Sequence, residues 1–218
     1  MKVRTNPPKS ARILIQWVDQ YARSVNQPPG RVHCWVSFMV LAGALERAGF
    51  SQKGGPKFTI KGGAALELRL RHLARTTKDL DLILNEESGS LFEELSGALS
   101  QPYEGFTFLV KGEPHAMPNG AIRLEVALRY LGRSWDTIPV DISRLEGKGT
   151  DVELVPAPLL KIFGIRSPES IPCLSLPFHV AQKIHALTEP HTADRPNTAF
   201  VILSICFFSG SGSPMFPL

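Results

Sequence analysis

The sequence predicts a mixed α/β domain in which a largely antiparallel sheet carries helices. Residues 10–24 show the 3.6-residue apolar period of a helix. Residues 121–130 instead alternate, with Ile122 and Leu124 on one side and Arg123 and Glu125 on the other, as in a strand with one buried face. Short turns separate these later segments, and short turns join antiparallel neighbours.

The elements can be assigned in order along the chain. Ser10 is placed to cap a helix over residues 10–24, and the Pro-Pro-Gly at 28–30 ends that pattern. A second helix over residues 31–48 is apolar on most sides, which is typical of a buried helix. The further elements that we expect are strands at 58–60, 79–84, 106–110, 121–130 and 135–142, helices at 64–73 and 91–99, and a turn-rich loop at 111–120.

The character of the chain changes near residue 155, after which prolines punctuate short segments. We therefore expect one domain over residues 1–155 and a small helical domain over residues 156–218, with a helix at 179–187. From residue 200 to the end the chain is apolar and then rich in Gly, Ser and Pro, and it carries no charge.

Composition limits the classes of function. The net charge of +4 permits a nucleic-acid partner without requiring one. Cys34, Cys173 and Cys206 are odd in number and lack metal-ligand spacing, which argues for a reducing cytosol and against a disulfide framework or a zinc site. No apolar run approaches the roughly 20 residues that span a bilayer, and no signal core follows the N-terminus, so we expect a cytoplasmic protein with no membrane contact.

A candidate phosphate site begins where the strand at 58–60 ends. Lys61, Gly62 and Gly63 come directly after the strand and directly before a helix. Glycine leaves room for backbone N–H groups to approach an anion, and the N-terminus of a helix favours negative charge. A Gly pair before a helix is also a common tight turn, so this motif alone is weak.

Carboxylates on the next strand strengthen the assignment. Asp79 and Asp81 are two residues apart, which places their side chains on one face, where they would repel unless a cation such as Mg²⁺ lay between them. Two-metal nucleotidyl transfer needs a third carboxylate from a neighbouring strand. Asp141 is the first candidate because apolar residues flank it, and Glu125 is the alternative.

Basic residues elsewhere have two interpretations. Lys183 lies on a predicted helix and is either a surface lysine or a point charge that contacts a triphosphate across the cleft. Arg69, Arg71, His72 and Arg75 form either a solvated helix face or a contact to RNA or phosphate.

Four segments together resemble the AbiEii/AbiGii toxin family of nucleotidyltransferases: residues 61–69, 74–82, 140–142 and 181–187. The resemblance implies a polymerase-β-like nucleotidyltransferase domain with a mixed sheet, followed by a helical domain. It implies that Asp79, Asp81, Asp141 and Lys183 are catalytic, that the three aspartates bind Mg²⁺, and that Lys61, Gly62, Gly63 and Lys183 bind an NTP. It further implies transfer of NMP to a hydroxyl, with a tRNA 3′ end as acceptor, and a DNA-binding antitoxin as partner.

The C-terminus departs from the family pattern. Residues 195–198 read Arg-Pro-Asn-Thr, on pattern, but the acidic motif that should follow is missing. We therefore expect an incomplete helical domain, aberrant after about residue 199, from a truncated or frame-shifted gene; the alternative is a tail that packs as a short buried helix or strand. Two other functions stay open: a small-molecule or protein acceptor, and a degenerate member that binds NTP or antitoxin without turnover.

Overall fold

The computed structural model describes residues 3–52, 54–70, 77–144, 151–158 and 160–188. Within them the helices are α1 (Ala11–Ser24), α2 (Pro29–Glu46), α3 (Gly62–Leu70), α4 (Leu91–Ala98), α5 (Leu176–Thr188) and a 3₁₀ helix at Leu160–Phe163. The strands are β1 (Phe58–Lys61), β2 (Leu80–Leu84), β3 (Phe106–Ala116), β4 (Ile122–Tyr130), β5 (Arg133–Arg144), β6 (Val152–Pro156) and β7 (Ser170–Leu174). No helix in these ranges is long and apolar enough to cross a membrane.

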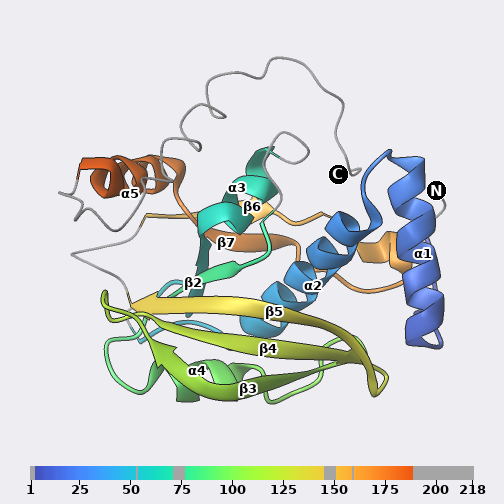
Figure 1. Cartoon of the computed structure of the whole chain (residues 1–218), viewed down its shortest axis with the longest axis horizontal. Coiled ribbons are helices and arrows are strands. Elements are labelled where there is room, and N and C mark those ends of the chain that lie inside the picture. The colour runs from blue at the N-terminus through green and yellow to red at the C-terminus, as the bar shows by residue number, and fades with distance from the viewer. Residues whose placement is uncertain (1–2, 53, 71–76, 145–150, 159, 189–218) are drawn as a thin grey trace.

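The strands form one mixed sheet in the order β3-β4-β5-β2-β1-β7-β6. The β2–β5 and β1–β7 pairs are parallel, and the other pairs are antiparallel. Figure 1 shows the long strands β3, β4 and β5 side by side at one end of the sheet. The mixed α/β class predicted from the sequence is therefore confirmed.

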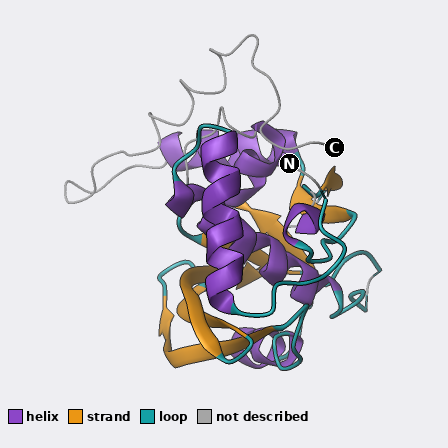
Figure 2. Cartoon of the chain, turned by 90° about the vertical axis from the view of Figure 1, so that its right-hand side faces the viewer, coloured by secondary structure: helices purple, strands orange, loops and turns teal. Residues whose placement is uncertain are grey.

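Helices α1 and α2 pack on the apolar face of the sheet. Ser10 caps α1, accepting a hydrogen bond from the Ile13 amide at 3.3 Å. The whole middle of α2 is buried, as its apolar sequence predicts, and it shares a core with Leu82 of β2 and Val140 and Ile142 of β5. Figure 2, viewed from the side on which α1 lies, shows that helix standing in front of the sheet.

The predicted loop at 111–120 is wrong for most of its length. Strand β3 continues to Ala116, with a register shift between Lys111 and His115 where it pairs with β4. Gly112 and Pro114 suggested a break, but β3 is an edge strand, where a bulge and a proline are tolerated because one side of the strand needs no hydrogen bonds. The turn itself is short, closed by the Met117 amide on the Ala121 carbonyl at 2.8 Å.

The sheet continues beyond residue 155. Strand β6 spans that position, and β7 adds the neighbouring strand beside β1 before α5 begins. The division into two domains therefore stays a prediction. The tail predicted to be aberrant lies outside the described residues.

A buried polar network joins α2 to the start of β5. The Ser37 hydroxyl accepts from Trp135 Nε1 at 3.0 Å and lies 2.8 Å from Asp136 Oδ2. The His33 ring stacks on Trp135, with centroids 3.9 Å apart, and its Nδ1 is 3.5 Å from Asp136. Burial raises the pKa of Asp136, but hydrogen bonds from His33, Ser37 and the Thr137 amide outweigh it, so the net shift is downward.

We expect Ser37→Ala to destabilise the fold by about 1–3 kcal/mol, because it leaves the buried Trp135 N–H without an acceptor. Urea unfolding of the whole chain measures this. Ser100→Ala is the matched control: its exposed hydroxyl donates to the Gly97 carbonyl at the end of α4, and its effect should stay within about 0.5 kcal/mol. Equal effects of the two substitutions would contradict a supporting role for Ser37.

Candidate active site

Four charged side chains form a row across neighbouring strands. Lys61 of β1 is opposite Asp81 of β2, which is opposite Asp141 of β5, which is opposite Arg123 of β4. Residues directly opposite one another in a sheet present their side chains on the same face. The structure thus brings the predicted Asp81 and Asp141 together through the parallel β2–β5 pair.

The two glycines pack against the loop and strand that carry the aspartates. Gly62 has φ +65°, and a Cβ built on it would lie 1.8 Å from Asp81 Oδ2. A Cβ on Gly63 would lie 2.8 Å from the Thr77 Cβ. The space left by the missing side chains is therefore filled by protein, and the Asp81 carboxylate lies beside the N-terminus of α3, where the helix favours negative charge.

Asp79 precedes β2 rather than lying within it, because the strand begins at Leu80. Its backbone is tied to the Thr77 hydroxyl, which donates to the Asp79 carbonyl at 3.2 Å. Glu67 in turn holds Thr77, because the Thr77 amide donates to Glu67 Oε2 at 3.5 Å. The loop that presents Asp79 is therefore attached to helix α3.

Glu67 links that loop to α2 as well. Its Oε1 accepts from Arg31 Nε at 2.9 Å, and the carboxylate is buried at 8% exposure. Burial raises the pKa of Glu67, against the lowering effect of Arg31 and of the Thr77 amide. A buried carboxylate held by a guanidinium and an amide indicates a supporting role for the Asp79 loop.

Asp141 is fully engaged by Arg123. Arg123 Nε and an Nη donate to the two Asp141 oxygens, each at 2.6 Å. The hydrogen bonds to Asp141, its charge, and the charges of Asp79 and Asp81 all raise the pKa of Arg123. One guanidinium thus lies in the field of all three aspartates.

The remaining predicted residues are placed as follows. Lys61 Nζ donates to Ser143 Oγ at 2.8 Å, on the same face as the aspartates. Glu125 is exposed opposite Pro139, so it lies farther along the sheet than Asp141. Lys183 lies on α5, but its side chain is outside the described residues.

Arg69 bonds Glu153 and the Leu174 carbonyl, which ties α3 to β6 and β7. Arg71, His72 and Arg75 are outside the described residues.

Arg123, Glu67 and Thr77 contribute to the site, although no sequence motif indicated them. Arg123 was assigned to the polar side of β4 without a partner. If the pairing of β4 with β5 next to the tight turn at Leu131–Gly132 continued without a shift, Arg123 would lie opposite Val140. A register shift between Leu128 and Arg129 moves the pairing by one residue and brings it opposite Asp141 instead.

The donor chemistry of the site suits a hard cation, because Asp79, Asp81 and Asp141 offer carboxylate oxygens of the kind that Mg²⁺ prefers. In the arrangement described, however, no three His, Cys, Asp or Glu side chains among the described residues converge as a metal site. Both oxygens of Asp141 are bonded to Arg123.

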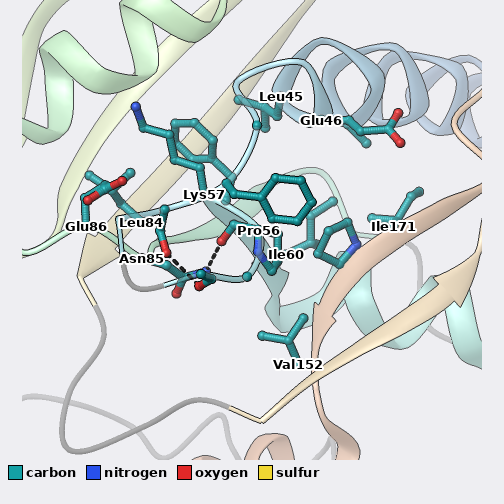
Figure 3. Close-up of a pocket in the computed structure, with 18 of the residues that line it drawn as sticks. Leu45, Glu46, Pro56, Lys57, Ile60, Leu84, Asn85, Glu86, Val152 and Ile171 are labelled. Atoms are coloured by element: carbon teal, nitrogen blue, oxygen red, sulfur yellow. Dashed lines mark hydrogen bonds between the residues drawn. The ribbon is translucent and has the colours of Figure 1, made fainter.

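The large cavity of the described chain is separate from this row. It has a volume of about 1300 Å³ and is lined by Phe58, Ile60 and Leu84, whose side chains alternate to the opposite face from Asp81. Figure 3 shows Asn85 at its wall, donating to the Pro56 carbonyl at 2.7 Å. None of the predicted site residues lines this cavity.

A family model described as the nucleotidyl transferase AbiEii toxin of type IV toxin–antitoxin systems matches residues 44–199. The solved structure of ANT(2")-Ia in complex with adenylyl-2"-tobramycin is similar at a TM-score of 0.40 and 14% identity, covering 78% of this chain and 86% of that chain. No curated protein matches.

The family match extends from the end of α2 through the Gly-Gly turn and all three aspartates to Lys183 and the Arg-Pro-Asn-Thr segment. The match includes all four segments that carry the resemblance, which lie between residues 61 and 187. The resemblance predicted from the sequence is confirmed, and the chain belongs to the AbiEii family of nucleotidyltransferases, the toxins of type IV toxin–antitoxin systems.

Proposed function

We propose that this nucleotidyltransferase moves a nucleoside monophosphate from an NTP to a hydroxyl acceptor, a tRNA 3′ end, with Mg²⁺ as its cofactor: the hydroxyl attacks the α-phosphate and pyrophosphate is released. The observation that carries the proposal is the position of Asp81, which lies between the N-terminus of α3 and Asp141 of the neighbouring strand. A carboxylate pair beside a helix N-terminus suits a nucleotide triphosphate and its cation.

Each residue has a distinct role in this proposal. Asp79 and Asp81 would hold the cation, and Asp141 would complete the site and accept the proton of the attacking hydroxyl. The amides at Gly62 and Gly63 and the Lys61 ammonium would bind phosphate oxygens, with Lys183 of α5 as a second point charge. When bound, Mg²⁺ neutralises phosphate charge and orients the reacting oxygens.

The charge of the chain and its family support the choice of acceptor and partner. The net charge of +4 is compatible with RNA, whose phosphates attract a basic protein. A toxin of this family implies a cognate antitoxin, which we propose to be DNA-binding, and a cytoplasmic location would give access to NTP, Mg²⁺ and tRNA. A small-molecule or protein hydroxyl is the alternative acceptor.

A second candidate function is binding of NTP or antitoxin without turnover. It is favoured by the pairing of Asp141 with Arg123, which leaves the three carboxylates unassembled in the described structure. Calorimetry of NTP binding with and without Mg²⁺, beside a turnover assay with labelled NTP, separates the two functions. Binding without transfer to RNA, small molecules or the protein itself would support the second.

We expect Asp79→Asn combined with Asp81→Asn to reduce transfer of labelled NMP to tRNA by about a hundredfold or more, because the amides cannot supply the anionic oxygens that hold a cation. Chelation of divalent cations by EDTA should abolish transfer by the unchanged chain. The assay measures label retained on RNA across the four NTPs.

Asp151→Asn is the matched control for this pair, since Asp151 is exposed and lies outside the row of charged residues. Its transfer rate should equal that of the unchanged chain. Transfer that survives the double substitution would overturn the assignment of these aspartates and, with it, the proposed reaction.

We expect Gly62→Ala to lower transfer at least about tenfold while the chain still folds. A side chain at φ +65° is strained by about 1–2 kcal/mol, and its Cβ would displace the Asp81 carboxylate. Gly97→Ala is the control, because nothing lies within 4 Å of its Cβ position and alanine favours a helix. Circular dichroism confirms folding, and full activity of Gly62→Ala would contradict close packing against Asp81.

A further inference from the structure

Arg123 holds the third carboxylate of the site in a complete two-pronged pair. Its Nε bonds Asp141 Oδ1 and its Nη bonds Asp141 Oδ2, both at 2.6 Å. A fork of this kind satisfies both oxygens in the plane of the carboxylate. Any cation that uses Asp141 as a ligand must therefore compete with Arg123 for the same oxygens.

The two partners are unequal in their surroundings. The Arg123 side chain is 49% exposed, whereas Asp141 is 15% exposed. Asp141 lies on β5, which has β2 on one side and β4 on the other, whereas the guanidinium of Arg123 is at the solvent-exposed end of the row. Arg123 can therefore leave the pair by rotating its side chain into solvent, without unpacking the core. Release would leave the largely buried Asp141 carboxylate without its partner, so the exchange needs an incoming cation to replace the charge of Arg123.

The negative charge around Arg123 also favours a role for its guanidinium as a counter-ion of the aspartates. Asp79 and Asp81 act on the guanidinium in addition to Asp141, and all three favour its charged form. Lys61, the other cation of the row, is directed toward Ser143. In this arrangement Arg123 is the positive charge that balances Asp141, in the place where a divalent cation would have to bind.

We propose that Arg123 is an exchangeable counter-ion: it pairs with Asp141 in the unloaded protein, is displaced when a divalent cation binds the aspartates, and then pairs with a nucleotide phosphate. This inference rests on the proposed function, because the exchange requires Asp79, Asp81 and Asp141 to bind a cation. It makes Arg123 a positioning residue for Asp141 before loading and a substrate contact after it.

Mn²⁺ binding to the whole chain without nucleotide, measured by calorimetry, tests the first half of the exchange. Removing the competing guanidinium in Arg123→Gln should tighten Mn²⁺ binding about threefold to tenfold. Arg123→Lys should lie between, since an ammonium keeps the charge but cannot form the fork. Arg129→Gln is the matched control on the same strand and the same face, and its affinity should be unchanged.

Nucleotide affinity tests the second half. With saturating Mn²⁺, Arg123→Gln should bind a non-hydrolysable NTP analogue about tenfold more weakly, and Arg123→Lys should recover part of that loss. A purely structural salt bridge would instead lower the unfolding temperature of Arg123→Gln and leave both affinities unchanged. That result, or weaker Mn²⁺ binding by Arg123→Gln, would overturn the exchange.

The outcome also separates this inference from the proposed function. If Mn²⁺ binding is lost when Asp79→Asn is combined with Asp81→Asn but is unchanged in Arg123→Gln, the exchange is overturned and the proposed metal site is retained. Mn²⁺ binding that is absent from the unchanged chain, or unaffected by the double aspartate substitution, overturns both.

Discussion

The parallel pairing of β2 with β5 is the constraint on which the site depends. It places Asp81 and Asp141 opposite one another although 59 residues separate them in the chain, and it makes β2 the strand that joins the two halves of the sheet. On the other side of β2, the antiparallel pairing with β1 brings Lys61 and the Gly-Gly turn to the same position. A shift of either register by one residue would turn a charged side chain to the apolar face.

Burial keeps that register in place. The residues that alternate with Asp81 on β2, namely Leu80, Leu82 and Leu84, are fully buried, and so are Val140 and Ile142 of β5, at 1% exposure or less. Helix α2 covers this face, and its Arg31 pairs with Glu67 of α3. The core that stabilises the sheet therefore also positions the Asp79 loop, through Glu67 and Thr77.

The site carries its own positive charges. Arg123 neutralises Asp141, and the N-terminus of α3 faces Asp81, so the carboxylates do not confront one another without compensation. The same groups that stabilise the unloaded carboxylates are those that would bind phosphate oxygens. Under the proposed exchange, such a site would have two states of similar charge balance: one with protein cations on the aspartates and one with a divalent cation and nucleotide.

The α/β class, most of the elements, the family and the candidates Gly62, Asp79, Asp81 and Asp141 could all be predicted from the amino-acid sequence, because apolar periodicity and motif order are local properties of a chain. The length of β3 could not be predicted in this way, since tolerance of Gly112 and Pro114 depends on an edge position that only the sheet defines.

The partner of Asp141 was decided by tertiary structure alone. A single register shift near Leu128 sets Arg123, rather than a neighbour on the other face, beside that carboxylate. The reason that Gly62 must be glycine was likewise decided by packing, because the Asp81 carboxylate fills the space of its missing side chain. Both depend on the pairing of distant strands, which is set by burial across the whole sheet and not by the residues adjacent in sequence.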